Sequence, residues 1–289
     1  MTYQVLLFYK YVTVEEPEAL RDSLSALAKE HTLLGRILVA DEGLNGTVEG
    51  SIEATEAFAK ELLKDERFSD MDIKRSTGDG EAFSKLYVKV REEIVGTRFD
   101  KKLIDPRKET ARHLSAEELR QWYEEQRDFV VVDMRNDYEY KSGHFKDSIN
   151  PELENSRDLP LALPKLGPLK AKTVLTVCTG GVRCEKMSAY LLANGFTDVY
   201  QLENGIHSYM EKYPGKDFEG TLYTFDRRKV MDFGGERSVI GRCYLCEAPT
   251  ENYVNCGNDF CHLHFLACSA CATSELTFCS DSCKETVAA

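Results

Sequence analysis

Short apolar runs with the composition of strands alternate with longer segments of helical period in the first part of the chain. Leu20, Leu24 and Leu27 share one face of a predicted helix over residues 17–29, because positions three or four apart lie on the same side. The order βαββαβ is typical of a ferredoxin-like α+β domain, which we expect over residues 1–92. Its predicted strands are 3–9, 34–40, 45–48, a short one at Ile73 and 86–90, and its second helix covers 55–63.

The connection between the second and third strands is unusually polar and rich in glycine. Its sequence is Asp41-Glu42-Gly43-Leu44-Asn45-Gly46-Thr47, and we expect its first four residues to form the turn. Turn chemistry alone explains glycine and aspartate in such a place. Contact with a bound substrate explains them equally well, so both interpretations stay open.

A second pattern, in which strands and helices alternate, covers residues 114–220. Ser115 and Glu118 form a capping box that starts a helix running through Trp122. Apolar runs at 130–132, 173–177 and 199–200 then alternate with helical segments. This alternation predicts a doubly wound, mainly parallel sheet with helices on both faces and ligands at the carboxyl ends of its strands.

The most reactive stretch of the chain follows the run at 173–177. Cys178 is followed by Thr179, Gly180 and Gly181, and a helical segment is expected over residues 185–193. Two glycines let successive backbone amides turn toward the sulfur, and a helix N-terminus adds positive potential. We expect Cys178 to be a nucleophilic thiolate in an anion cradle formed by Gly180, Gly181 and Arg183. The alternative is a buried cysteine beside an ordinary glycine turn.

Four residues separate Cys178 from Arg183, whereas cysteine phosphatases have a loop one residue longer. The tighter loop suits a single sulfur atom. Upstream, Asp133 and Arg135 end a buried strand, where burial requires that their charges be paired, and Glu139 or Arg183 are the expected partners. Together with Gly143-His144-Phe145 and Ser148-Ile149-Asn150, these motifs resemble those of rhodanese-type sulfurtransferases, in which the cysteine carries a persulfide.

Three further residues near these motifs allow more than one interpretation. Cys184 is close enough to attack a persulfide on Cys178, as a resolving cysteine, or it faces the core. His144 is expected to have a structural hydrogen-bonding role. His207, with no partner visible in the sequence, is expected to be a packing or surface residue.

Composition limits the class of protein. The chain has 289 residues, of which 42% are hydrophobic, and no stretch reaches the roughly 20 apolar residues of a membrane span. Its N-terminus lacks the basic start of a signal peptide, so we expect a cytoplasmic protein with no membrane partner. The net charge of −12 argues against non-specific binding to nucleic acid, and we expect no DNA partner.

Residues 93–113 are predicted to be a basic connector between the two domains. A basic segment in an acidic protein is a candidate phosphate contact, although a solvated linker explains the charges equally well. The candidate RNA-binding residues are Arg98, Lys101, Lys102, Arg107, Lys108, Arg112 and, beside the reactive loop, Lys186.

Eight of the ten cysteines lie in the last part of the chain, residues 221–289. Two C-x2-C pairs present thiolates at the spacing of tetrahedral zinc sites, which we favour over disulfides because no export signal is visible. One partition groups Cys243, Cys246, Cys268 and Cys271 at one ion, and Cys256, Cys261, Cys279 and Cys283 at the other, although spacing leaves the pairing open. The zinc would be structural, because so small an apolar core hardly folds unaided.

Four features occur together: the stretch from Glu42 to Thr47, Asp133-Met134-Arg135-Asn136, the run from Cys178 to Lys186, and the cysteine-rich tail. In combination they resemble the rhodanese-related tRNA uridine hydroxylase family. The resemblance implies oxygen-dependent hydroxylation of the wobble uridine of tRNA to 5-hydroxyuridine, with Cys178 as the catalytic cysteine. It also implies contact with the anticodon loop and molecular oxygen as co-substrate. No flavin, haem, non-haem iron or nucleotide motif is visible, so the residues give no account of oxygen activation.

Two other functions remain open from the residues. One is a sulfurtransferase that carries a persulfide on Cys178 and receives sulfur from thiosulfate or a donor protein. The other is a zinc-stabilised RNA-binding module with a vestigial loop, which is disfavoured because Cys178, both glycines and Arg183 are all present.

Overall fold

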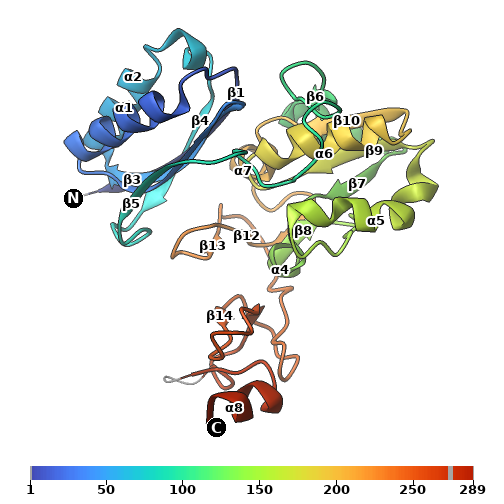
Figure 1. Cartoon of the computed structure of the whole chain (residues 1–289). Coiled ribbons are helices and arrows are strands. Elements are labelled where there is room, and N and C mark those ends of the chain that lie inside the picture. The colour runs from blue at the N-terminus through green and yellow to red at the C-terminus, as the bar shows by residue number, and fades with distance from the viewer. Residues whose placement is uncertain (1, 273–275, 289) are drawn as a thin grey trace.

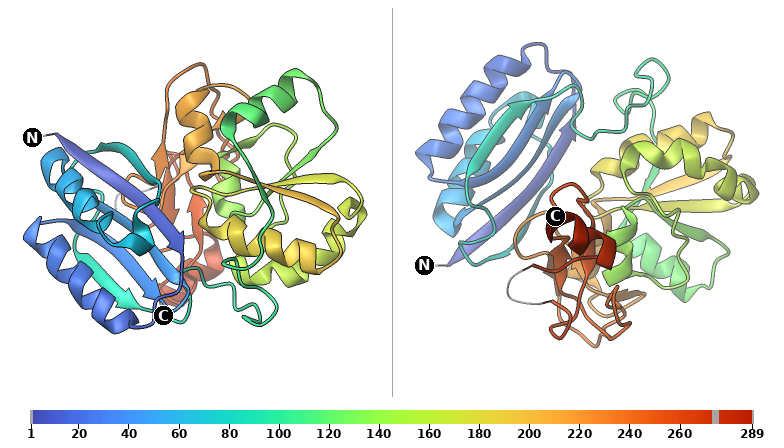
Figure 2. Two further views of the ribbon diagram at one scale, coloured as in Figure 1. Left: turned by 90° about the horizontal axis from the view of Figure 1, so that it is seen from above. Right: turned by 60° about the horizontal axis from the view of Figure 1, so that its bottom comes forward.

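The computed structural model describes residues 2–272 and 276–288. Along the chain they form a first sheet domain, a central sheet domain and a small C-terminal module (Figure 1). Figure 2 shows the two larger domains side by side, with the C-terminal module beside their junction. Among the described residues, none of the helices is both long and apolar enough to span a bilayer.

The first domain is a five-stranded sheet in the order β4-β1-β3-β2-β5. The βαββαβ order of its first six main elements confirms the predicted ferredoxin-like fold, and β5 adds a parallel edge strand beside β2. The turn between β2 and β3 is shorter than expected, because Gly43 pairs with Ala40 in the ladder and only Asp41 and Glu42 connect the strands. The elements are β1 (Tyr3–Tyr11), α1 (Pro17–Glu30), β2 (Leu34–Ala40), β3 (Gly43–Ser51), α2 (Ile52–Leu62), η1 (Glu66–Phe68), β4 (Ile73–Gly78) and β5 (Leu86–Val90).

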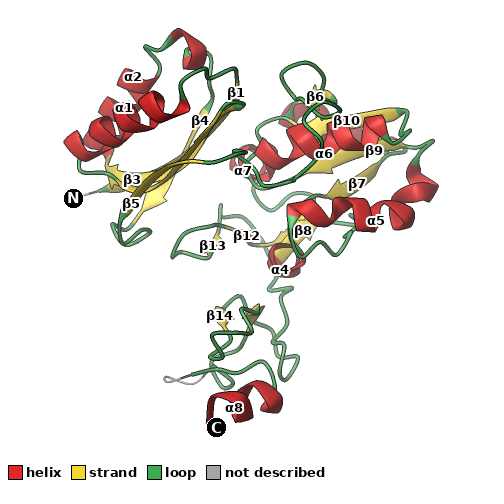
Figure 3. Cartoon of the chain, in the orientation of Figure 1, coloured by secondary structure: helices red, strands yellow, loops and turns green. Residues whose placement is uncertain are grey.

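Both helices of this domain cover the same face of the sheet. Strand alternation sends Leu6, Phe8 and Ile37 to that face, where they join the buried core around Phe58. The opposite face carries no helix and is turned toward the central domain (Figures 1 and 3). We call it the helix-free face.

The central domain is a four-stranded parallel sheet in the order β6-β10-β9-β7. Separate apolar clusters pack on its two faces, which confirms the predicted doubly wound arrangement. Ser115 and Glu118 form the expected capping box. The elements are β6 (Arg112–Leu114), α3 (Ala116–Glu124), β7 (Val130–Asp133), α4 (Asp137–Ser142), β8 (Gly143–Phe145), η2 (Ser156–Asp158), α5 (Leu159–Leu166), η3 (Gly167–Leu169), β9 (Thr173–Val177), α6 (Val182–Ala193), β10 (Asp198–Leu202) and α7 (Gly205–Lys212).

The last part of the chain first returns to the junction of the two domains. Strand β11 (Phe218–Gly220) pairs with β8, and β12 (Leu222–Tyr223) forms a hairpin with β13 (Val230–Met231). Arg228 in this hairpin donates hydrogen bonds to Ser76 Oγ and the Thr77 carbonyl at the edge of the first sheet. The hairpin therefore connects both domains. Strands β14 (Tyr253–Asn255) and β15 (His264–Leu266) and helix α8 (Asp281–Ala288) follow in the cysteine-rich module.

Candidate active site

Cys178 directly follows β9, at the carboxyl end of a central strand, and its side chain is fully buried. The Gly181 amide donates a hydrogen bond to its Sγ atom over 3.3 Å. Gly181 has φ of +100°, and a Cβ there would lie 2.6 Å from the Tyr9 hydroxyl of the first domain. The position therefore requires glycine for both its backbone conformation and the close approach of the neighbouring domain.

The surroundings of Cys178 favour its thiolate. Burial by itself raises the pKa of Cys178. Its effect is outweighed by a hydrogen bond from the Cys184 thiol, by the charge of Arg183 and by the backbone amides of Cys184 and Arg183. Together these lower the pKa of Cys178 to about 6. Burial and the adjacent Cys178 sulfur raise the pKa of Cys184 well above its ordinary value. At neutral pH the pair is therefore one thiolate and one thiol.

We predict that the alkylation rate of Cys178 rises with pH through a midpoint near 6 and is level above it, because only the thiolate reacts. The rate is measured with iodoacetamide by mass spectrometry in a Cys184→Ser variant, where the hydroxyl still donates a hydrogen bond. A midpoint at or above about 8.5, the value for a free cysteine, would contradict the cradle.

Arg183 is held by an acid of the neighbouring helix α4. Its guanidinium forms a two-point ion pair with Glu139, at 2.5 and 2.8 Å, and also donates to Thr179 Oγ1 over 3.0 Å. Both charged side chains are buried. Since its hydrogen bonds go to Glu139 and Thr179, Arg183 acts on the Cys178 sulfur through its charge.

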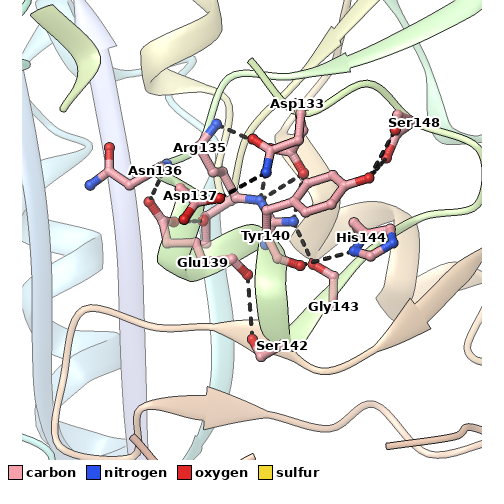
Figure 4. Close-up of polar contacts among 12 residues, drawn as sticks. Asp133, Arg135, Asn136, Asp137, Glu139, Tyr140, Ser142, Gly143, His144 and Ser148 are labelled. Atoms are coloured by element: carbon pink, nitrogen blue, oxygen red, sulfur yellow. Dashed lines mark hydrogen bonds and ion pairs between the residues drawn. The ribbon is translucent and has the colours of Figure 1, made fainter. Parts of the chain in front are cut away.

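Asp133 and Arg135 have different partners from those expected. They pair with each other at 2.6 Å, and Arg135 also donates to the Gly143 carbonyl over 2.6 Å (Figure 4). The expected partner Glu139 is instead engaged by Arg183. The Asp133–Arg135 pair therefore ties the end of β7 to the start of β8. His144 stacks on Tyr140 and contacts its carbonyl, which fits a structural role.

A cavity of about 470 Å³ lies between the helix-free face and the reactive loop. Thr179, Gly180 and Arg183 of the reactive loop line it, whereas the neighbouring Cys178 side chain is fully buried and is not part of the lining. Asn45 and Thr47 of the polar β2–β3 region also line it. The remaining lining comes chiefly from Leu7, Tyr9, Arg36 and Leu38 of the sheet, from Asn136 and Arg157, and from His207, Phe225 and Arg228.

His207 was expected to be a packing or surface residue and Phe225 carried no expectation, but both line the cavity. His207 is 3% exposed, and its Nδ1 has no hydrogen-bond partner among the described residues. Phe225 is 47% exposed although aromatic, and the Arg183 guanidinium lies 5.3 Å from its ring centroid. The feature of the sequence that could have located His207 is the pair Asn204-Gly205 at the start of α7. Gly205 has φ of +72°, and a Cβ added there would lie 2.6 Å from the Cys178 carbonyl oxygen. Helix α7 must therefore begin against the reactive loop.

Most of the candidate RNA-binding cations have acidic partners in the structure. The expectation that Lys186 is available to RNA has to be corrected. Its side chain is 2% exposed and pairs with Glu42 at 2.8 Å, so it joins the two domains and offers no free charge. In the connector, only Arg98 and Lys102 lack an ion pair within the described residues. The paired cations are Lys101 with Asp41, Arg107 and Lys108 with Asp105, and Arg112 with Asp198.

The eight cysteines of the tail gather in the two sets considered from the sequence. Cys243, Cys246, Cys268 and Cys271 form one, and Cys256, Cys261, Cys279 and Cys283 form the other. Within each set the sulfur atoms lie within 4.8 Å of one another, and all ten cysteines of the chain are free of disulfides. Four thiolates at such separations can hold one metal ion.

Three family models match consecutive parts of the chain. A model described as the UPF0176 acylphosphatase like domain matches residues 3–94, one described as the rhodanese-like domain matches 115–212, and one described as rhodanase C-terminal matches 219–284. A solved structure of a rhodanese-like domain protein from Staphylococcus aureus is 30% identical, covers 34% of this chain and 90% of its own, and has a TM-score of 0.30.

Similarity to two curated proteins extends over almost the whole length. The tRNA uridine(34) hydroxylase of Cytophaga hutchinsonii is 42% identical over 98% of this chain and 90% of its own. The protein of that name from Staphylococcus aureus strain Newman is also 42% identical, over the same shares of the two chains. The chain therefore belongs to the tRNA uridine(34) hydroxylase family.

Proposed function

We propose that this protein hydroxylates the wobble uridine of tRNA to 5-hydroxyuridine, with molecular oxygen as co-substrate and Cys178 as the catalytic cysteine. Relatives that share 42% identity over nearly the whole chain are named for this activity. The observation that carries the proposal is the cavity above the Cys178 loop. It sets Thr179, Gly180 and Arg183 of the reactive loop opposite a surface supplied by the first domain. Because its substrate is tRNA, we place the reaction in the cytoplasm.

The cavity suits a nucleotide better than a small sulfur donor. Its volume of about 470 Å³ is within the usual range for small-molecule sites, and its lining combines apolar, aromatic and basic groups. Phe225 and Tyr9 offer aromatic surfaces for a base, and Arg36 and Arg157 add positive charge. A uridine in the single-stranded anticodon loop leaves its stack at low cost, so it can enter such a cavity.

The runner-up function is sulfur transfer through a persulfide on Cys178, supplied by thiosulfate or a donor protein. The tight fit of the Gly181 amide to the Cys178 sulfur favours it, because the loop encloses a single sulfur atom. Nucleoside mass spectrometry separates the two functions. Deleting the gene should remove 5-hydroxyuridine from tRNA, and restoring it should bring the nucleoside back. If 5-hydroxyuridine survives deletion and sulfur transfer from thiosulfate to cyanide is lost, sulfur transfer is the activity.

We also propose that each cysteine set of the tail binds one structural zinc ion. All-thiolate sets of four are typical of closed structural zinc sites, and the module has little apolar core of its own. Zinc would supply cross-links between segments distant in sequence. The chemistry of the reaction would stay with the Cys178 loop.

Protein purified without chelator is expected to contain zinc, at two ions per chain for the two sets. Replacing Cys246 by alanine should lower the zinc content by one ion, since it removes a ligand from one set only. Elemental analysis measures the content. Protein without metal whose tail cysteines are joined in disulfides would exclude the zinc sites.

A further inference from the structure

The helix-free face continues beyond the cavity onto the edge strand β5. Arg36 of β2 lines the cavity, and its partner in the parallel register of β5 is Tyr87. The alternation of side chains places Lys89 on the same face as Tyr87, and Lys85 also reaches the Tyr87 ring. Lys85 Nζ and Lys89 Nζ lie 4.7 and 4.9 Å from the ring centroid. We call Arg36, Lys85, Tyr87 and Lys89 the Tyr87 cluster.

The cations of this cluster have no acidic partner, in contrast to most of those in the connector. Arg36, Lys85 and Lys89 are exposed and form no ion pair within the part of the chain that the structure describes. What distinguishes these three from other cations without an ion pair is that they gather around one aromatic ring beside the cavity. Arg157, on the opposite side of the cavity, is likewise exposed and without an ion pair in the described residues. Unpaired positive charge thus flanks the cavity on two sides.

Tyr87 adds a second property to this surface. Its ring is 37% exposed on the outer strand of a sheet. Proteins that bind single-stranded nucleic acid combine cations along the backbone with aromatic rings on which bases stack. An acidic protein partner would be attracted by the cations, but it would not require an aromatic side chain next to a cavity at the reactive loop. The combination therefore favours a single-stranded nucleic acid.

We propose that the Tyr87 cluster binds the RNA strand next to the nucleotide whose base enters the cavity. In this arrangement Lys85, Lys89 and Arg36 contact successive phosphates, Tyr87 stacks on a neighbouring base, and Arg157 holds the strand on the far side. The proposal rests on the proposed function and relocates the main phosphate contacts from the connector to the helix-free face.

The test measures binding of an anticodon stem-loop RNA by fluorescence anisotropy over a range of salt concentrations. A variant with Arg36→Gln, Lys85→Gln and Lys89→Gln should lose at least about tenfold in affinity, and its salt dependence should fall by about one unit of slope for each phosphate contact removed. Tyr87→Ala should weaken binding by about tenfold with little change in slope, and Tyr87→Phe should restore it, because stacking needs the ring alone.

The matched control removes three other exposed lysines that form no ion pair in the described residues, Lys29, Lys60 and Lys172, each replaced by glutamine. This control should bind like the wild type, and the alkylation rate of Cys178 should be unchanged in it. If the cluster variant and the control bind the RNA equally well while the wild type still forms 5-hydroxyuridine, the Tyr87 cluster is not the RNA-binding surface. The proposed hydroxylase function is unaffected by that result. If the wild type neither binds the RNA nor modifies it, both proposals fall.

Discussion

Replacing Glu139 by alanine is expected to destabilise the central domain by about 3–5 kcal/mol, because it leaves the buried Arg183 guanidinium without its ion pair. Unfolding in urea is followed by the fluorescence of Trp122, the one tryptophan of the chain, which is buried in the core of this domain. The signal therefore reports on the domain that holds the reactive loop.

The matched control is Glu152→Ala. Glu152 also pairs with a cation, Lys165, but this pair is exposed, so its loss should cost only about 0–1 kcal/mol. Equal stability of the Glu139 and Glu152 variants would show that the Arg183–Glu139 pair does not hold the loop in place.

Replacing Cys178 by serine is expected to reduce 5-hydroxyuridine in tRNA to the level of cells without the gene. The pKa of Cys178 is about 6, so the sulfur is ionised at neutral pH, whereas a serine hydroxyl in the same cradle stays protonated. Nucleoside mass spectrometry measures the product, and Trp122 fluorescence during urea unfolding shows that the variant is folded. Wild-type levels of 5-hydroxyuridine in a folded Cys178→Ser variant would remove Cys178 from the reaction.

The reactive loop could be predicted from the sequence because its chemistry is local. Cys178, Gly181 and Arg183 lie within one strand, turn and helix, so their spacing fixes the cradle. The two cysteine sets could be predicted for a related reason, since pairs of cysteines at short spacing are typical ligands of one metal ion.

The cavity could not be predicted, because its walls come from elements that meet only through domain packing. Tyr9, His207 and Phe225 belong to three separate segments, and no short motif connects them. The same limit explains the error at Lys186, whose positive charge suggested a surface until the fold placed Glu42 against it. In the connector, Asp105 neutralises Arg107 and Lys108, and a count of charges along the sequence does not show which acids turn toward which cations.

The central claim is that the Cys178 loop directs oxygen to the wobble uridine of tRNA. The most direct measurement grows cells lacking the gene under oxygen gas enriched in the heavy isotope, with wild-type or Cys178→Ser protein supplied, and analyses 5-hydroxyuridine by mass spectrometry. Wild-type cells should contain 5-hydroxyuridine that carries the heavy oxygen, and Cys178→Ser cells should contain none. Unlabelled 5-hydroxyuridine in wild-type cells, or labelled 5-hydroxyuridine at wild-type levels with Cys178→Ser, would contradict the claim.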